Sequence, residues 1–183
     1  MLFCGVDTSN YTTSLALCDG EGRIIANFKE PLPVKPGECG LRQSDAVFAH
    51  TRNLPSVTSR LRGLLSSAEY GGERIAAYGV SATPRDAEGS YMPCFLTGVA
   101  AASAMADSSG VPLYRFSHQN GHIMAAARRS LLNPESTLPF TFPAALPRRF
   151  LSSRAAHRAR LFRFALSEVR MTSTPVRLST AQE

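Results

Sequence analysis

The sequence predicts an α/β protein in which three antiparallel strands are followed by two parallel strand–helix units. Three short apolar runs lie within the first 30 residues and are separated only by tight turns. From residue 44 to residue 129, helical and strand patterns then alternate, which is typical of parallel strands connected by crossover helices.

The first three strands are predicted from apolar runs that end at turn-forming residues. Residues 1–9 (MLFCGVDTS) contain the first run, and residues 12–19 (TTSLALCD) alternate apolar and small residues up to a turn at Asp19 and Gly20. Residues 22–30 (GRIIANFKE) follow that turn. Because the connections are tight, we expect the three strands to be neighbours in one sheet.

The middle of the chain predicts a helix, a strand and a second helix. Residues 44–67 carry apolar residues at helical spacing, and Pro55 is expected to kink or divide this helix. Residues 74–82 (RIAAYGVSA) are short and apolar, as in a buried strand. Residues 90–110 are rich in small residues that allow close packing, and the helix there is expected to end near Gly110.

A last strand over residues 111–117 and a helix opening with residues 118–129 complete the order βββαβαβα. This order is that of a single lobe of the actin-like ATPases, an architecture of the ribonuclease H-like class. From residue 130 onward no strand or helix pattern is found.

Composition divides the chain near residue 126. Residues 1–126 hold ten Lys/Arg and eleven Asp/Glu, whereas residues 127–183 hold ten Arg, no Lys and three Glu. All thirteen glycines lie in the first part. We therefore predict one lobe over residues 1–126 and a non-native or disordered Arg-rich segment over residues 127–183. The net charge of +6 comes from that segment, so it does not by itself indicate a nucleic-acid-binding domain.

Other features of the composition exclude several classes of protein. No apolar run approaches the length of a membrane span, and the N-terminus lacks the pattern of a signal peptide. A cytoplasmic location without membrane association is therefore expected. The four cysteines lie far apart with no CxxC pair, which indicates neither a disulfide framework nor a cysteine-type zinc site.

His118 and His122 lie one turn apart at the start of the last predicted helix. This spacing lets two imidazoles converge on one divalent metal ion such as Zn or Fe. The alternative is a pair of surface or helix-capping histidines. No Glu follows His118, which excludes an HExxH metalloprotease motif. Two ligands also leave a metal site incomplete, so a third must come from elsewhere.

Asp7, Thr8 and Ser9 begin a hydroxyl-rich turn between the first two strands. In actin-like lobes this hairpin reaches toward the nucleotide phosphates, and these residues are candidates for cofactor binding there. The alternative is an ordinary Asx or Ser turn. The small-residue turn within residues 86–98 is similarly either an anion or acyl-group site or a helix cap. No catalytic residue is assigned.

Four stretches of the sequence, in this order and spacing, closely resemble the N-terminal half of the glycoprotease-like (Gcp-like) family. They are residues 5–19, 40–55, 78–106 and 111–126. The best-known members of this family are tRNA N6-threonylcarbamoyladenosine synthases. The resemblance implies a duplicated ATPase-type lobe and transfer of threonylcarbamoyl from its AMP adduct to adenosine 37 of tRNA.

The resemblance also implies roles for particular residues and partners. His118 and His122 match the two metal-binding histidines of the family. ATP, threonylcarbamoyl-AMP and tRNA would be bound by a full-length relative. A shorter, lobe-only paralogue is an expected heterodimer partner, and a homodimer is the alternative.

The chain departs from the family at the first turn. Tyr11 and Thr12 replace an acidic pair that is implicated in the transfer chemistry. A glycine-rich turn before the second predicted helix is replaced as well. The chain thus resembles a divergent, Firmicutes-type paralogue whose activity is not implied by the family.

The Arg-rich segment has a second interpretation at the level of codons. Read one base out of frame, residues 138–147 permit AFHFSGGTT and residues 165–181 permit AFGGTDDIHAGQAIDR, two hallmarks of the family's second lobe. We interpret the segment as an out-of-frame second lobe. The polypeptide is then a truncated member with little or no activity by itself. The alternatives are a non-catalytic lobe that acts in dimerisation, and RNA binding by the arginines, whose affinity would fall steeply with salt.

Overall fold

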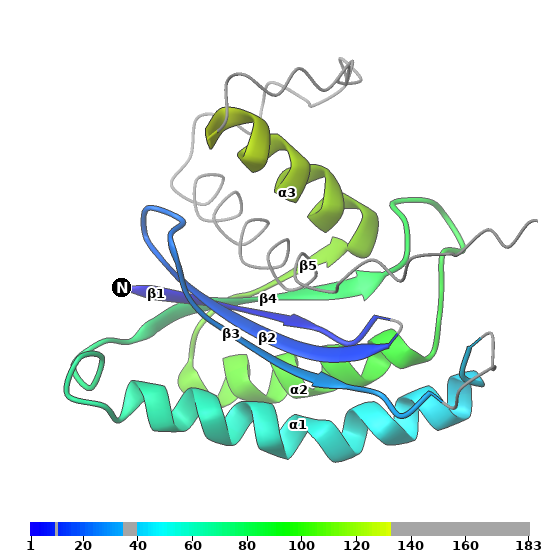
Figure 1. The fold of residues 1–183 in the computed structure, drawn as a ribbon, viewed down its shortest axis with the longest axis horizontal. Helices are drawn as coiled ribbons and strands as arrows, with labels where there is room; N and C mark the ends of the chain where they lie inside the picture. Colours follow the sequence, from blue (N-terminus) through cyan, green and yellow to red (C-terminus); the bar gives the residue numbers. More distant parts are fainter. Residues whose placement is uncertain (10, 35–39, 133–183) are drawn as a thin grey trace, which may run out of the picture.

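The computed structural model describes residues 1–9, 11–34 and 40–132, with the backbone alone for residues 126–132. The predicted order βββαβαβα is confirmed (Figure 1). The elements are β1 (Leu2–Asp7), β2 (Thr12–Asp19), β3 (Ile24–Pro31), α1 (Gln43–Leu65), β4 (Ile75–Thr83), α2 (Cys94–Ser109), β5 (Leu113–Ser117) and α3 (His118–Leu132).

The five strands form one mixed sheet in the order β3-β2-β1-β4-β5. The pairs β1–β2 and β2–β3 are antiparallel, whereas β4 lies parallel to β1 and β5 lies parallel to β4. With three consecutive antiparallel strands and two parallel crossover strands, this is a ribonuclease H-like lobe. The carboxyl ends of β1, β4 and β5 therefore lie at the same edge of the sheet.

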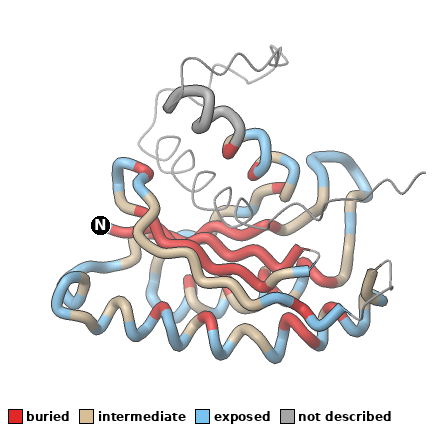
Figure 2. Tube along the Cα trace, viewed as in Figure 1, coloured by how far each residue is buried: buried red, intermediate tan, exposed pale blue. Residues whose placement is uncertain are grey.

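The alternation of side chains along β1 separates the two faces of the sheet. Leu2, Cys4 and Val6 belong to the main hydrophobic core, on the face covered by α1 and α2. Phe3 points to the opposite face, which carries α3, and forms a second cluster there with Cys18 and Ala77. Figure 2 shows that the most deeply buried residues lie in the central strands, between these two layers of helices.

Pro55 and Gly110 are the two positions at which the sequence predicts a change in helix geometry. Pro55 lies inside α1, which continues through it and is not divided. Gly110 ends α2 in the left-handed conformation (φ 63°), as predicted from its position, because glycine has no Cβ to disfavour this geometry. Among the described residues, no helix is both long and apolar enough to cross a bilayer.

The predicted boundary at residue 126 falls within α3. The interpretations of the Arg-rich segment, including the frameshift, RNA binding and disorder, concern residues that lie almost wholly beyond residue 132 and therefore outside the described ones. The division into two parts stays a prediction.

Candidate metal site at the carboxyl edge of the sheet

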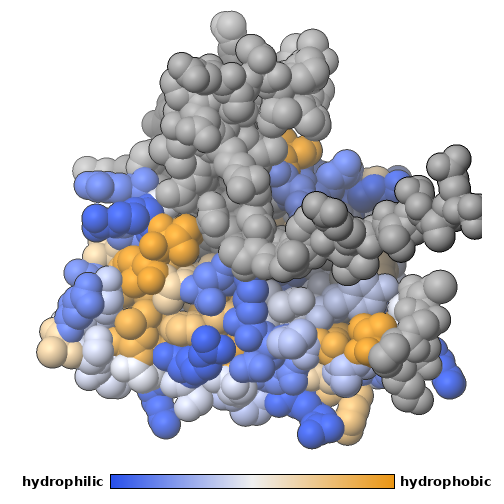
Figure 3. Space-filling view, in the orientation of Figure 1, coloured by the Kyte–Doolittle hydropathy of each residue, from blue (hydrophilic) through white to orange (hydrophobic). Residues whose placement is uncertain are grey.

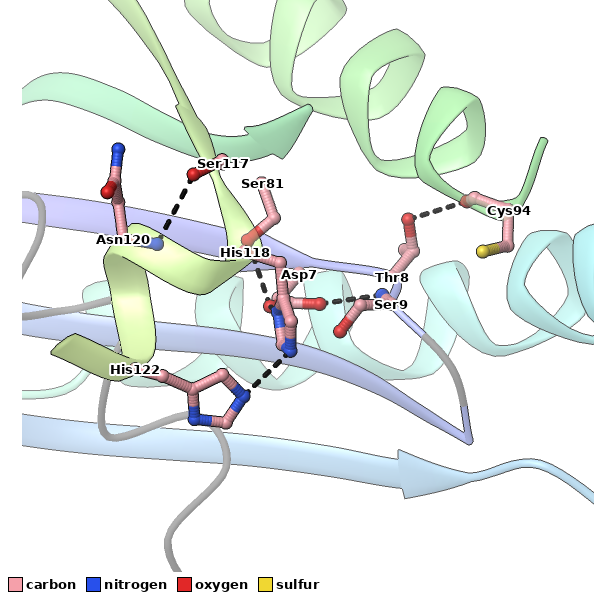
Figure 4. Close-up of polar contacts among 9 residues, drawn as sticks. All are labelled: Asp7, Thr8, Ser9, Ser81, Cys94, Ser117, His118, Asn120 and His122. Atoms are coloured by element: carbon pink, nitrogen blue, oxygen red, sulfur yellow. Dashed lines mark hydrogen bonds and ion pairs between the residues drawn. The ribbon is translucent and has the colours of Figure 1, made fainter. Parts of the chain in front are cut away.

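Three neighbouring strands bring polar side chains together where they end (Figure 4). Asp7 is the last residue of β1, Ser81 lies near the end of β4, and His118 follows β5 directly as the first residue of α3. In open α/β sheets, the carboxyl ends of parallel strands are the usual location of ligand sites. The fold therefore places these residues where a functional site is expected.

Both carboxylate oxygens of Asp7 are engaged. Oδ1 accepts a hydrogen bond from the backbone N–H of Ser9 (2.6 Å), and Oδ2 accepts one from the hydroxyl of Ser81 (2.9 Å). Oδ2 also lies 2.9 Å from Nδ1 of His118. The side chain is buried, with 3% of its surface exposed. A buried carboxylate requires such a set of donors, because burial without them disfavours its charge.

The pKa of Asp7 reflects two opposed effects. Burial by itself raises this pKa, but the hydrogen bond and electrostatic interaction with His118, together with hydrogen bonding to Ser9, bring the pKa below its ordinary value. Asp7 is therefore ionised at neutral pH and acts as a hydrogen-bond acceptor only.

His118 and His122 are in direct contact. Their Nε2 atoms lie 2.8 Å apart, and the rings stand almost perpendicular, with 4.5 Å between centroids. The hydroxyl of Ser117 accepts the backbone N–H of Asn120 (3.2 Å) and so caps the first turn of α3. The helix thus begins at His118, which places the two imidazoles on one face, as the spacing predicts.

The separation of the two Nε2 atoms is compatible with a shared metal ion. Two nitrogens at about 2.0–2.1 Å from a zinc ion lie about 2.9 Å apart at a right angle and about 3.4 Å apart in a tetrahedron. The observed 2.8 Å is close to the first value and shorter than the second, so a tetrahedral ion would require the two rings to move apart. Within the described residues, no third His, Cys, Asp or Glu completes a ligand set.

Thr8 does not face an open site. Its hydroxyl donates to the backbone carbonyl of Cys94 (2.8 Å) and accepts from the backbone N–H of Gly98 (3.0 Å), both in α2. The side chain is fully buried. Ser9 differs, because its buried Oγ has no hydrogen-bond partner among the described residues. Of the predicted turn, Ser9 is therefore the hydroxyl with remaining capacity to bind a ligand.

The start of α2 was a second candidate for anion binding. Four of its backbone N–H groups already donate to protein acceptors: the side chain of Gln43, the carbonyls of Met92 and Pro93, and the hydroxyl of Thr8. The side-chain acceptors come from Gln43 and Thr8, outside residues 86–93, and the N-cap residue Pro93 makes no side-chain cap hydrogen bond. Whether this turn binds an anion or an acyl group stays a prediction.

Ser81 was not singled out from the sequence. It lies in a strand predicted as buried and carries no motif. Its position near the carboxyl end of β4 would have indicated it, because β4 lies parallel to β1 and next to it. That relationship can be recognised only when the order of the strands in the sheet is known.

The fold and the site together define a ribonuclease H-like lobe with an Asp–His–His chain at the carboxyl edge of its sheet. No family model matches the sequence, and no curated protein does. The structure is similar to YeaZ from Pseudomonas aeruginosa, with 19% identity over 70% of this chain and 49% of that one, and a TM-score of 0.49.

Two further solved structures extend the comparison. A P. aeruginosa protein described as similar to peptidase YeaZ shares 19% identity over 69% of this chain and 48% of its own, with a TM-score of 0.48. RuvC from Thermus thermophilus, solved with a Holliday junction substrate, shares 16% identity over 91% of each chain, with a TM-score of 0.43. The chain spans about half the length of the first two structures. Similarity at this level does not assign a function.

Proposed function

We propose that this chain is the first lobe of a Gcp-like protein and that His118 and His122 hold a divalent metal ion, Zn or Fe. The observation that carries the proposal is the 2.8 Å contact between the two Nε2 atoms at the carboxyl edge of the sheet. A bound metal would act as a Lewis acid that attracts an anionic ligand. Ser9, with its buried hydroxyl, is the residue of the adjacent turn that would donate to such a ligand.

Metal binding is tested by dialysis of the metal-free full chain against Zn²⁺ or, without oxygen, Fe²⁺, followed by metal analysis. One metal ion per chain is expected for the wild type. The His122→Ala variant should lose it, because one imidazole is not sufficient. Gln119→Ala is the matched control, since Gln119 is exposed on the same turn of α3 and contributes no ligand. Equal binding by His122→Ala and wild type would contradict the proposal.

For the whole protein to which this lobe belongs, we propose the activity that the resemblance implies. This activity is transfer of threonylcarbamoyl to adenosine 37 of tRNA, in the cytoplasm. Ligands of actin-like proteins bind between two lobes, and the described residues form one. We expect little or no transfer by this polypeptide alone. The test combines it with tRNA, threonine, bicarbonate, ATP and an adduct-forming enzyme, and measures modified adenosine. Clear turnover would contradict this part of the proposal.

A second candidate function is a non-catalytic interaction module. A small core cluster lies where α1 and α2 start and includes Ala46, Ala49 and Phe95. Beside it in the sequence, two large apolar side chains are exposed, Phe48 at 64% and Leu96 at 53%. On the face shown in Figure 3, hydrophobic residues lie in separate areas among polar ones.

Association is tested by light scattering of the purified chain and by capture of a lobe-only paralogue. Under this second function, wild type forms a homodimer or binds the paralogue, and a Phe48→Ser, Leu96→Ser double variant does neither. Gln119→Ala again serves as the surface control. A monomeric wild type that also fails to bind the paralogue would remove this candidate.

A further inference from the structure

Asp7 contacts the histidine pair from the side opposite to the proposed metal. Its Oδ2 lies 2.9 Å from Nδ1 of His118, while Nε2 of the same ring lies 2.8 Å from His122. The two nitrogens of one imidazole are thus used for different partners. Asp7 itself therefore belongs outside the ligand set and acts on the ring that carries a ligand.

The donors around Asp7 determine which nitrogen of His118 carries the proton. The backbone N–H of Ser9 and the hydroxyl of Ser81 both donate to the carboxylate, so its oxygens accept. With Ser9 and Ser81 already donating to the carboxylate, the remaining contact at Oδ2 is completed by a donor on His118, which assigns a proton to Nδ1. In the neutral ring, Nε2 then bears a lone pair, and the short contact to His122 requires the proton of that bond to come from His122.

We propose that Asp7 is a positioning residue that holds His118 in the Nδ1-protonated tautomer with the Nε2 lone pair directed at His122. A divalent cation at this site would take the place of the proton between the two Nε2 atoms, and a neutral His122 would then carry its one proton on Nδ1, so the pair loses no proton. Only this last step rests on the proposed metal function. The tautomer and orientation of His118 belong to the metal-free protein.

The surrounding structure fixes the positions of Asp7 and His118 relative to each other. Asp7 is held from the β1–β2 turn by Ser9 and from β4 by Ser81. The start of α3 is held separately, because the backbone N–H of Gln119 donates to the carbonyl of Pro84 (3.1 Å). Rotation of the His118 ring would remove one of the donors to a buried carboxylate, which is costly. Outer partners of metal-binding histidines commonly fix the tautomer in this way.

The tautomer is measured by nitrogen NMR of the ¹⁵N-histidine-labelled, metal-free full chain. For the wild type, the spectrum should show His118 protonated at Nδ1. In Asp7→Asn, the amide can donate as well as accept, so we expect a mixture or the opposite tautomer. If metal binds, the affinity of Asp7→Asn should fall by about 10- to 100-fold.

Asp86→Asn is the matched control for the loss of charge. Asp86 is an exposed acid at the same edge. Its carboxylate accepts a hydrogen bond from the side chain of Asn120 in α3 (3.2 Å), and within the described residues it makes no hydrogen bond or ion pair with His118. It should leave both the His118 tautomer and metal affinity unchanged. If Asp7→Asn does not fold by circular dichroism, Ser81→Ala, which keeps the carboxylate and removes one competing donor to Oδ2, should leave His118 protonated at Nδ1, and a change to the Nε2 tautomer would overturn the inference.

The outcomes separate this inference from the proposed function. An Nδ1-protonated His118 that changes in Asp7→Asn supports the positioning role even if no metal binds. An Nε2-protonated His118 in the wild type overturns it, even if metal does bind. A fall in metal affinity that is equal in Asp7→Asn and Asp86→Asn, with no change of tautomer, also overturns it, because general electrostatics would then be the cause.

Discussion

The hydroxyl of Thr8 at the end of β1 accepts a hydrogen bond from the backbone N–H of Gly98 in α2, 90 residues away in the sequence. The same hydroxyl donates to the carbonyl of Cys94 one turn earlier. A Cβ atom at position 98 would lie 2.7 Å from Oγ1 of Thr8. Strand and helix therefore approach each other closely only because residue 98 lacks a side chain.

Gly98→Ala should destabilise the lobe in spite of the better helix propensity of alanine. The contact is with a buried side chain that is itself held by two hydrogen bonds, so it cannot move without breaking them. We expect a loss of about 1–3 kcal/mol in the free energy of unfolding, measured by urea denaturation. Gly63→Ala in α1 is the control, because a Cβ there meets nothing within 4 Å, and it should stabilise by about 0.5–1 kcal/mol. A neutral Gly98→Ala would show that the helix can shift.

Thr8→Ala should also destabilise, and its effect should be coupled to that of Gly98→Ala. The single change removes a buried hydroxyl that donates to the carbonyl of Cys94 and accepts from the N–H of Gly98, at a cost of about 1–3 kcal/mol. It also removes the atoms with which the new Cβ collides. In a double-mutant cycle, Gly98→Ala should cost less in the Thr8→Ala background, with a coupling of about 0.5–3 kcal/mol. Strict additivity would mean that the two residues do not contact each other in solution.

Thr13→Val tests a second buried polar contact between a strand and a helix. Oγ1 of Thr13 in β2 lies 2.8 Å from Nδ1 of His50 in α1, and both residues are fully buried. Valine keeps the shape but leaves the imidazole nitrogen without this partner, so we expect a loss of about 1–3 kcal/mol. Thr51→Val on the exposed side of α1 should stay within about 0.5 kcal/mol. Similar effects of both changes would argue against the buried bond.

Stability should fall at alkaline pH in a way that depends on Tyr78. Two causes raise the pKa of Tyr78 to about 12: first its burial in the main core, and second the electrostatic interaction with Cys4. The unfolded chain ionises near the ordinary value of about 10. The contribution of the neutral phenol is therefore fully present below pH 10 and is lost between pH 10 and about 12.

The measurement is the free energy of unfolding of wild type and Tyr78→Phe at several pH values in that window. The variant should lose less stability than wild type between pH 10 and pH 12. Parallel curves for the two proteins would show that Tyr78 ionises equally in the folded and unfolded chains.

Local sequence patterns were sufficient to predict the helices and strands and their order. The predicted strand over residues 12–19 coincides with β2, and α2 ends at the predicted Gly110. These features depend on neighbours in the chain: side-chain alternation, turn residues and a glycine that accepts a left-handed backbone. Pro55 does not divide α1, which packs through its apolar side chains against the main core on both sides of that residue, and a kink at Pro55 stays a prediction.

The site could be predicted only in part. The spacing of His118 and His122 indicated a pair on one helical face, and the structure has their Nε2 atoms in contact. The turn of Asp7, Thr8 and Ser9 was singled out as a group, yet the structure gives each residue different partners. Their separate roles depend on α2 and α3, which lie far away in the sequence.

The sequence by itself determined what helix and strand geometry fix over a few residues: the eight elements, their order and the two histidines one turn apart. Tertiary structure decided that β1 lies between β2 and β4. That order brings Asp7 into contact with a histidine 111 residues away. It also packs Thr8 against Gly98. Contacts of this kind arise from the register and packing of several elements at once, and no local pattern of residues encodes them.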